Sequence, residues 1–240
     1  AGADMMELNF GCPNIGIMQK TLGDLSGNEE EVLGAVVGQS TSLIGRIIQA
    51  VKETIRTPIM AKLTPEVTDI SAVAKACIEK GVDLLDVSNN RSGLPGVDIY
   101  NDGRPLFKNL ETQSFSGFCG PSVKPITLKN VAQIKLTNPT AQIVASGGLM
   151  NWKDAVEAMM CGAKVTAYCT VIIWEGWEVL KEIEKGLLKY MEGQGYDRLE
   201  DLYAAGLKYI TTPDKVSFKY VVAKVNYKKC NGCGICCKPG

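Results

Sequence analysis

Short apolar, β-branched segments alternate along this chain with amphipathic stretches about 10 to 18 residues long. This alternation predicts repeated β-α units around a parallel sheet. The predicted strands are Met5–Phe10, Ile59–Leu63, Leu84–Ser88, Gln142–Ser146 and Val165–Cys169. The predicted helices are Thr41–Thr54, Ile70–Lys80, Ile126–Leu136, Lys153–Cys161 and Trp174–Met191.

Glycines mark the ends of two of these helices. Gly81 and Gly162 directly follow predicted helices, at the position where a left-handed residue commonly ends a helix. Each is followed by two residues and then by a strand. The similar sequence Gly2-Ala3-Asp4 precedes the first predicted strand. We therefore expect the first residues to follow a helix outside this sequence, and the chain to be a fragment of a longer protein.

The fold class that this pattern favours is α/β, as part of a (β/α)8 barrel. Closing eight strands into a barrel removes the exposed sheet edges, so five strands predict about strands four to eight of one. A complete five-stranded doubly wound domain is the alternative. Two long loops, at residues 13–39 and 90–125, follow strand ends, on the face where barrels build active sites.

The β-α alternation stops near Gly193, and this suggests three segments. Residues 1–193 are assigned to the barrel. Residues 194–225 are assigned to a connector in which Asp197–Ile210 forms one more helix. Residues 226–240 form a cysteine-rich end.

Composition narrows the possible functions. Lysine and arginine together number 26, and aspartate and glutamate together also number 26. The chain therefore has no net positive charge that would favour binding to nucleic acid. The longest apolar runs fall far short of the roughly 20 residues that span a membrane. Four of the nine cysteines crowd the last eleven residues, a distribution unlike a disulfide framework, so a reducing cytoplasm is expected. The absence of histidine excludes histidine-based catalysis and metal ligation within this chain.

Polar side chains and glycines stand at the predicted strand ends. Asn9 offers an amide that can pair with an amide-bearing heterocycle, although it also suits a cap of the strand end. Lys62 places an ammonium at the mouth of an apolar barrel, where an anionic or electron-rich partner is expected unless water solvates it. Asn89 and Asn90 close the third strand. Glycine-rich or polar turns that suit a phosphate occur at Gly117, at Gly147-Gly148 and at Cys169-Thr170.

The cysteine-rich end has the spacing of an iron–sulfur motif. Cys230, Cys233 and Cys236 are separated by two residues each, as in the ligands of one 4Fe-4S cluster. In such motifs a fourth cysteine usually follows the third after three more residues, and that position is Gly240, the last residue of this sequence. Cys237 directly follows Cys236 and does not have this spacing. A zinc site that uses Cys237 is the alternative.

The strings Leu8-Asn9-Phe10-Gly11-Cys12-Pro13 and Ala61-Lys62-Leu63-Thr64-Pro65-Glu66-Val67-Thr68-Asp69-Ile70 resemble the dihydroorotate/dihydropyrimidine dehydrogenase family, most closely its dihydropyrimidine dehydrogenases. The resemblance covers residues 1–190. It implies an FMN site formed by Lys62, Gly117, Gly147, Gly148, Cys169 and Thr170, and a pyrimidine-like substrate at Asn9, Asn89 and Asn90. It also implies a ferredoxin-like 4Fe-4S segment at the C-terminal end and an NAD(P)H/FAD electron-transfer subunit or domain as partner.

The chain departs from the family at the proton-transfer residue. The family has a cysteine in a Cys-Gly-Gln context, where this chain has Val37-Gly38-Gln39, and a valine cannot transfer a proton. Ser26, Ser40, Thr41 and Cys12 are the candidate replacements, and their spacing selects none of them. The family also has Asn-Thr where this chain has Asn89-Asn90, so Asn89 matches the family and Asn90 is a second departure, at a predicted substrate contact.

The function that the resemblance implies is an FMN- and iron–sulfur-dependent oxidoreductase that acts on the CH–CH group of a pyrimidine. A related oxidoreductase acting on another cyclic amide is one alternative, and a non-catalytic electron-transfer subunit is another. Activity is expected from the longer protein rather than from this chain by itself.

Overall fold

The computed structural model describes residues 2–12, 37–88 and 90–237. Contacts divide the chain into two units, Ala1–Ile210 and Thr211–Gly240, which are described separately. The predicted loop at residues 13–39 falls mostly outside the described residues, and its end forms a 3-10 turn at Val37–Gln39.

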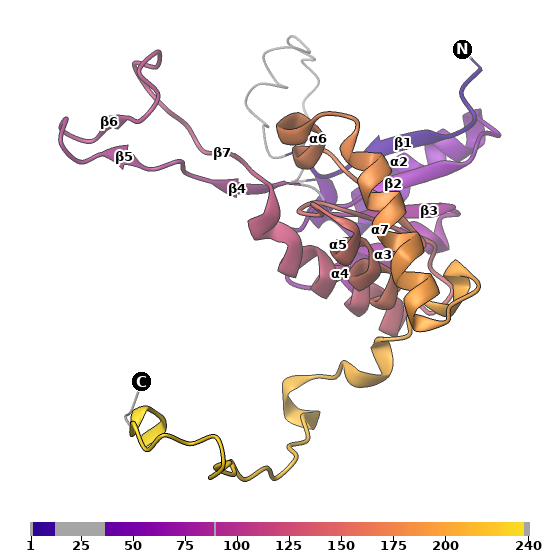
Figure 1. Cartoon of the computed structure of the whole chain (residues 1–240). Coiled ribbons are helices and arrows are strands. Elements are labelled where there is room, and N and C mark those ends of the chain that lie inside the picture. The colour runs from indigo at the N-terminus through magenta and orange to yellow at the C-terminus, as the bar shows by residue number, and fades with distance from the viewer. Residues whose placement is uncertain (1, 13–36, 89, 238–240) are drawn as a thin grey trace. The chain divides into compact units, whose positions relative to one another are not determined.

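The first unit is built on a five-stranded parallel sheet (Figure 1). In sheet order its strands are β1 (Met6–Asn9), β2 (Ile59–Lys62), β3 (Leu84–Val87), β8 (Ile143–Ser146) and β9 (Val165–Ala167). The five predicted strands are confirmed to within two residues at each end. The register places Asn9 beside Lys62, and Lys62 beside Asp86, so that the polar strand ends meet at one edge.

Helices connect these strands. They are α2 (Thr41–Thr54), α3 (Ile70–Glu79), α4 (Lys124–Thr137), α5 (Trp152–Met160), α6 (Thr170–Glu175) and α7 (Val179–Gln194). Side chains cap three of them: Ser40 and Asp69 cap α2 and α3, and Asn151 caps α5 in a capping box with Asp154. Gly81 and Gly162 have φ of 86° and 116°, as their predicted positions after helices require.

The predicted helix Trp174–Met191 is wrong, because two helices occupy this part of the chain. The first, α6, ends at Glu175, and α7 begins at Val179. Gly176, the C-cap of α6, has a φ of 80°, which a continuous α-helix does not permit.

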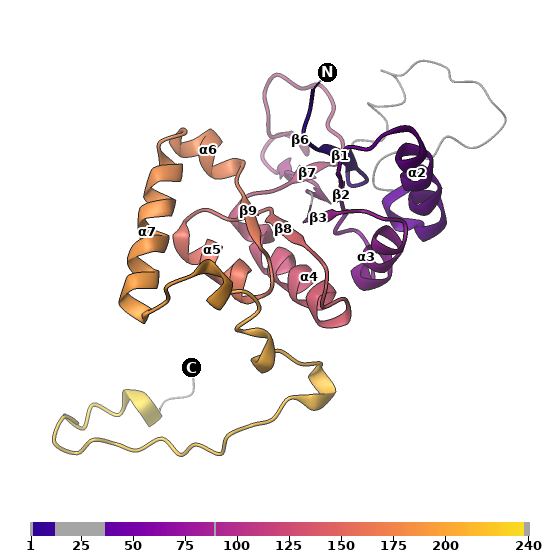
Figure 2. The same ribbon diagram turned by 90° about the vertical axis from the view of Figure 1, so that its right-hand side faces the viewer.

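The helices that connect the strands lie on one face of the sheet. Strand order follows chain order throughout the described sheet, and right-handed crossovers then place successive helices on the same side. Figure 2 shows the helices in an arc around the strands. The outward side chains of the strands form one buried core with α2, α3 and α4: Ile59, Ala61, Leu85, Val87, Ile143 and Ala145 from the strands, and Ile44, Ile48, Val73, Val131 and Ile134 from the helices. This arrangement contradicts the doubly wound alternative, which needs helices on both faces.

The second predicted loop, residues 90–125, is partly strand. It contains β4 (Arg91–Gly93), β5 (Val97–Asp98), β6 (Arg104–Pro105) and β7 (Ser116–Phe118). β4 pairs with β7 and β5 with β6, both antiparallel, in two small sheets separate from the main one (Figure 1). A 3-10 turn at Pro121–Val123 then leads into α4.

The predicted helix Asp197–Ile210 is also wrong. Only 3-10 turns form there, at Leu199–Asp201 and Leu207–Tyr209. Leu202 is buried against Met159 and Met191. The amide of Ala204 donates to the Met159 carbonyl oxygen at 2.9 Å. Backbone hydrogen bonds to the end of α5 therefore replace bonds within a helix.

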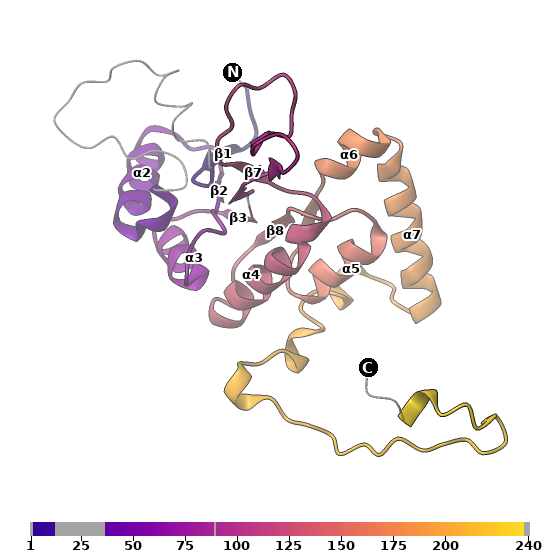
Figure 3. The same cartoon turned by 90° about the vertical axis from the view of Figure 1, so that its left-hand side faces the viewer.

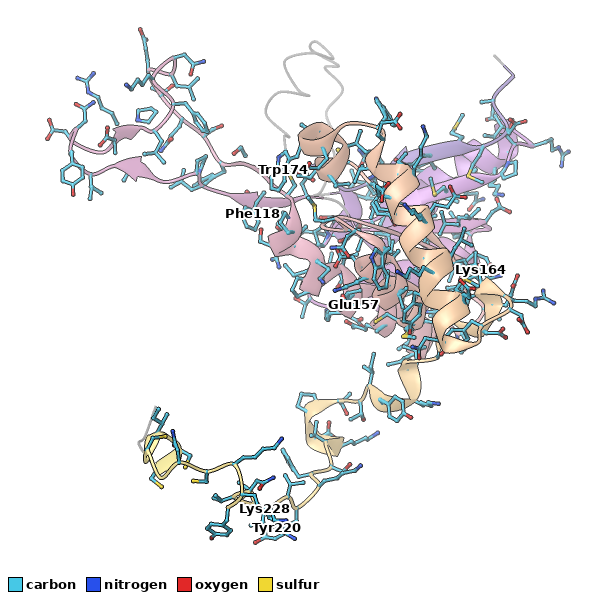
Figure 4. All side chains as sticks on the ribbon, in the orientation of Figure 1. Phe118, Glu157, Lys164, Trp174, Tyr220 and Lys228 are labelled. Carbon is cyan, nitrogen blue, oxygen red and sulfur yellow. The ribbon has the colours of Figure 1, made fainter. Side chains whose placement is uncertain are left out.

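The second unit has no buried residue among residues 211–237, every one of which is exposed. Figure 4 labels two of these exposed residues, Tyr220 and Lys228. Its short turns are Pro213–Lys215 and Ile235–Cys237. In the described parts of both units, no helix has the length and apolarity that crossing a membrane requires.

Candidate functional site

A cavity of about 550 Å³ opens at the carboxyl ends of the parallel strands. Residues from the ends of β1, β2, β3 and β8 line it, together with the loops that follow β8 and β9. Parallel sheets bind ligands at this edge, because the strand ends and the following loops converge there. Its volume lies within the range of small-molecule and cofactor sites.

Most of the predicted site residues meet at this cavity. Lys62, Gly147, Gly148, Cys169 and Thr170 line it, as do Asn9 and Asn90.

The remaining two predicted site residues are Gly117 and Asn89. Gly117 lies on β7 and is not among the lining residues, although a Cβ placed on it would be 2.9 Å from Nδ2 of Asn90. Asn89 falls outside the described residues.

Lys62 has its anionic partner inside the protein. Its Nζ donates to Oδ2 of Asp86 at 2.7 Å and lies 3.9 Å from Oε1 of Glu7. Burial alone would lower the pKa of Lys62, but the hydrogen bond and charge of Asp86, together with the charge of Glu7, raise it above its ordinary value. The lysine is therefore a firmly protonated donor at the cavity. An ammonium has three protons to donate, so binding Asp86 leaves capacity for a ligand.

Asp86 connects Lys62 to the fourth strand of the sheet. Its side chain is 4% exposed, and its second oxygen, Oδ1, accepts a hydrogen bond from the Ser146 hydroxyl. Ser146 Oγ also lies 2.8 Å from the carbonyl oxygen of Ser88. Asp86 thus joins the ends of β2, β3 and β8 beneath the cavity.

Glu7, on β1, is the second carboxylate beside Lys62. Burial raises the pKa of its carboxyl, Lys62 opposes this rise, and the charge of Asp86 adds to it. Two carboxylates therefore share one ammonium, with Asp86 the nearer of the two.

The glycines after β8 allow close packing against the start of α4. A Cβ on Gly148 would lie 2.4 Å from the backbone nitrogen of Lys124, and Gly148 has a φ of 82°. Thr127 donates to the carbonyl oxygens of Ser146 and Gly147 at 3.1 and 2.9 Å. Close packing and these two hydrogen bonds hold the turn against α4 at the wall of the cavity.

Lys124 fastens the start of α4 to α5. Its Nζ donates to Oδ1 of Asp154 at 2.7 Å and to Oε2 of Glu157, labelled in Figure 4, at 2.9 Å. These hydrogen bonds raise the pKa of Lys124, burial opposes the rise, and the charges of both carboxylates add to it. Because Asp154 also caps α5, this contact links two of the helices that support the cavity wall.

None of the candidate proton-transfer residues that the structure describes lines the cavity. Val37, the residue at the position of the family's cysteine, is buried in the core. Of the candidates, Ser40 is the N-cap of α2 and accepts a hydrogen bond from the Leu43 amide. Thr41 begins α2, and Cys12 is half-buried. Ser26 falls outside the described residues.

The C-terminal cysteines are exposed in the second unit. Within residues 2–12, 37–88 and 90–237, no group of three or more cysteine, aspartate or glutamate side chains is arranged to hold a metal ion. Cys230 Sγ does accept a hydrogen bond from the Gly232 amide at 3.4 Å. The cluster ligands Cys230, Cys233 and Cys236 stay a prediction.

Sequence reasoning missed Asp86 and Glu7. One signal was available for Asp86: a single carboxylate inside the apolar string Leu84-Leu85-Asp86-Val87, on the strand after the one that carries Lys62. A buried acid in such a run requires a partner.

Comparison with known proteins identifies relatives of this chain. The family model for dihydroorotate dehydrogenase matches residues 1–191. The NAD-dependent dihydropyrimidine dehydrogenase subunit PreA of Escherichia coli (strain K12) is 31% identical over 241 residues, which is 98% of this chain and 55% of that protein.

Catalytic subunits of dihydroorotate dehydrogenase B (NAD(+)) are similar too. The protein from Pyrococcus abyssi is 30% identical over 86% of this chain and 62% of its own length. The protein from Methanothermobacter thermautotrophicus is 32% identical over 83% of this chain and 59% of its own length. The chain thus spans a little more than half the length of these relatives.

Proposed function

Because this chain belongs to the dihydroorotate dehydrogenase family, whose members are flavin oxidoreductases built on a (β/α)8 barrel, we propose that it forms part of an FMN-dependent oxidoreductase. The proposed reaction is hydrogen transfer at the CH–CH group of a pyrimidine ring. The observation that carries the proposal is the cavity at the strand ends, where Lys62, Asn9 and the Gly147-Gly148 turn converge.

The side chains at the cavity fit a flavin. Lys62 supplies a charged donor for an electron-rich ring carbonyl, and Asp86 holds it in position. The Gly147-Gly148 turn brings backbone without side chains to the cavity wall, as the approach of a phosphate requires. When bound, FMN would supply hydride transfer, either to a carbon–carbon double bond or from the corresponding saturated CH–CH group. The chain's own part is to orient the flavin and the substrate at this edge.

Lys62→Gln is expected to weaken FMN binding about 10- to 100-fold, because it removes a charge-assisted hydrogen bond. Fluorescence titration of the flavin-free full-length protein with FMN measures this. Lys52→Gln is the matched control, since Lys52 pairs with Asp83 at the surface, away from the cavity. Equal FMN affinity in both variants would contradict the role of Lys62.

For the substrate we propose a dihydropyrimidine rather than dihydroorotate. The similarity to subunit PreA covers 98% of the chain, whereas the similarity to the two dihydroorotate dehydrogenase B subunits covers 86% and 83%. Oxidation of dihydrouracil and of dihydroorotate by the full-length protein with its electron-transfer partner separates the two substrates. A preference for dihydroorotate would reverse this assignment, and a protein without flavin would refute the proposed function.

A second candidate function is supported by the position of Val37. The family's proton-transfer position is here a buried apolar side chain of the core. An oxidoreductase acting on another cyclic amide, or an electron-transfer subunit without catalysis, agrees with that substitution. Flavin reduction without turnover of any pyrimidine or related amide would favour the electron-transfer subunit.

We further propose that residues 226–240 begin a ferredoxin-like module with a 4Fe-4S cluster, joined by residues 194–225 to a barrel segment at residues 1–193. Cys230, Cys233 and Cys236 would bind the cluster, and the hydrogen bond from the Gly232 amide to Cys230 Sγ is typical of cluster thiolates. The cluster would carry electrons between the flavin and an NAD(P)H- and FAD-containing subunit or domain.

Cys233→Ser is expected to abolish the cluster's electron paramagnetic resonance signal in the full-length protein, because a serine oxygen binds iron poorly in place of a thiolate. Cys237→Ser, one residue beyond the motif, serves as control and is expected to retain the signal and the iron. Bound zinc that is lost in Cys237→Ser would instead establish the four-cysteine zinc site.

A further inference from the structure

A second cavity lies away from the proposed flavin site, between the loop that follows β2 and the start of α4. Its volume is about 550 Å³, and it shares no described lining residue with the cavity at the strand ends. Figure 3 shows α3 and α4 side by side where this loop leads into α3. From the loop, Pro65, Glu66, Val67 and Thr68 line the cavity.

Asn130 on α4 contributes a buried amide without a partner. Asn130 is one of the residues that line the cavity and is 3% exposed, and its Nδ2, itself a buried atom, has no hydrogen-bond partner within the described part of the chain. Gln133, one turn later on the same face, donates to Asp69 in the loop at 3.0 Å. Asn130 therefore lies on the face of α4 that is turned toward the loop. A buried donor without a partner is unfavourable, and an acceptor oxygen on a ligand would restore the missing hydrogen bond.

The charges around the cavity favour an anion. Arg91 and Lys129 are cationic and Glu66 is anionic, so the lining carries one net positive charge. Arg91 is neutralised by Glu66 through two contacts of 3.2 Å. Lys129 is exposed and forms no ion pair with the carboxylates that the structure describes. One uncompensated ammonium beside one unpaired amide matches a single carboxylate.

The rest of the wall is apolar. Pro65, Val67, Pro125 and Ile126 offer a surface on which a ring or a short hydrocarbon packs. An inorganic phosphate would leave this surface exposed to water. We infer that the cavity between the β2–α3 loop and α4 binds a small organic carboxylate, with its oxygens at Lys129 and Asn130 and its apolar body against the two prolines.

The test is a titration of the full chain with benzoate, followed by the side-chain amide resonances of Asn130 and by calorimetry. We expect saturable binding that shifts the Asn130 resonances. Benzamide, which has the same ring without the charge, should bind at least about tenfold more weakly, because it cannot pair with the ammonium. Inorganic phosphate should not displace benzoate.

Two variants locate the binding. Lys129→Met and Asn130→Leu should each weaken benzoate binding at least about tenfold. Lys75→Met is the matched control, because Lys75 is an exposed lysine on α3 that does not line the cavity, and it should leave the affinity unchanged. Lys129 is at the surface, so its variant tests the site even if Asn130→Leu folds poorly.

Three outcomes would overturn the inference. They are binding that does not saturate, benzoate affinity unchanged in both variants, and phosphate binding as tightly as benzoate with the same resonances shifted. None of these measurements uses flavin or turnover, so their result is independent of the proposed oxidoreductase function.

Discussion

Asp86→Asn is expected to lower the free energy of unfolding by about 2 to 4 kcal/mol. The substitution keeps the shape of the side chain but removes the charge that accepts from Lys62 at 2.7 Å. Asp86 is 4% exposed and Lys62 23%, so water can only partly replace the lost partner. Glu7, at 3.9 Å, retains some of the attraction and keeps the loss below that of a fully buried pair. Urea unfolding of the chain measures the change.

The control is Asp83→Asn, just before the same strand. Asp83 pairs with Lys52 at the surface, with 44% of its side chain exposed, and it also accepts the Ile59 amide. An asparagine can still accept that amide, so the loss should not exceed about 1 kcal/mol. A loss from Asp86→Asn no larger than that of the control would contradict the central role of Asp86.

A double substitution isolates the cause of the loss. Adding Lys62→Met to Asp86→Asn removes the ammonium that would otherwise lack its nearest counter-ion. Part of the stability lost in the single variant should then return. A fully additive loss would indicate instead that the two side chains contribute independently.

Gly148→Ala is expected to destabilise the protein by about 3 to 5 kcal/mol and to impair FMN binding. Two effects add. A φ of 82° is unfavourable for any residue with a Cβ, and that Cβ would lie 2.4 Å from the Lys124 backbone nitrogen. Either the end of β8 or the start of α4 must move, and both support the cavity. Thermal unfolding and FMN titration measure the two consequences.

Gly176→Ala separates these two effects. Gly176 has a nearly equal φ of 80°, but a Cβ placed on it meets nothing within 4 Å. It should cost only the backbone strain, about 1 to 3 kcal/mol, because a φ of 80° with a ψ of 175° is a conformation that essentially only glycine adopts. Similar losses in both variants would show that the contact with Lys124 contributes little.

Much of the barrel segment was predictable because its determinants are local. Alternating apolar segments indicated all five strands, and glycines at Gly81 and Gly162 indicated two helix ends. Parallel strands end at one edge of a sheet, which is why the amino-acid sequence was enough to expect Asn9, Lys62 and the Gly147-Gly148 turn together. The family resemblance drawn from the same residues is confirmed.

Two helix predictions were wrong, and in one of them contacts with distant segments take the place of hydrogen bonds within a helix. Residues 197–210 have a helical pattern, but Ala204 donates to Met159 and Leu202 packs against Met191. Gly176 separates α6 from α7, although a glycine within an amphipathic pattern is not by itself a reliable break.

The amino-acid sequence by itself determined the order of strands and helices, the family and the residues at the strand ends, because periodicity, capping and motifs are properties of neighbouring residues. Only the tertiary structure decided how those residues are paired. That Lys62 binds Asp86, that Ser146 binds the same carboxylate, and that Asn130 lines a second cavity follow from strand register and helix packing. The two contacts of Asp86 join positions 24 and 60 residues apart in the chain, and burial strengthens them by excluding water.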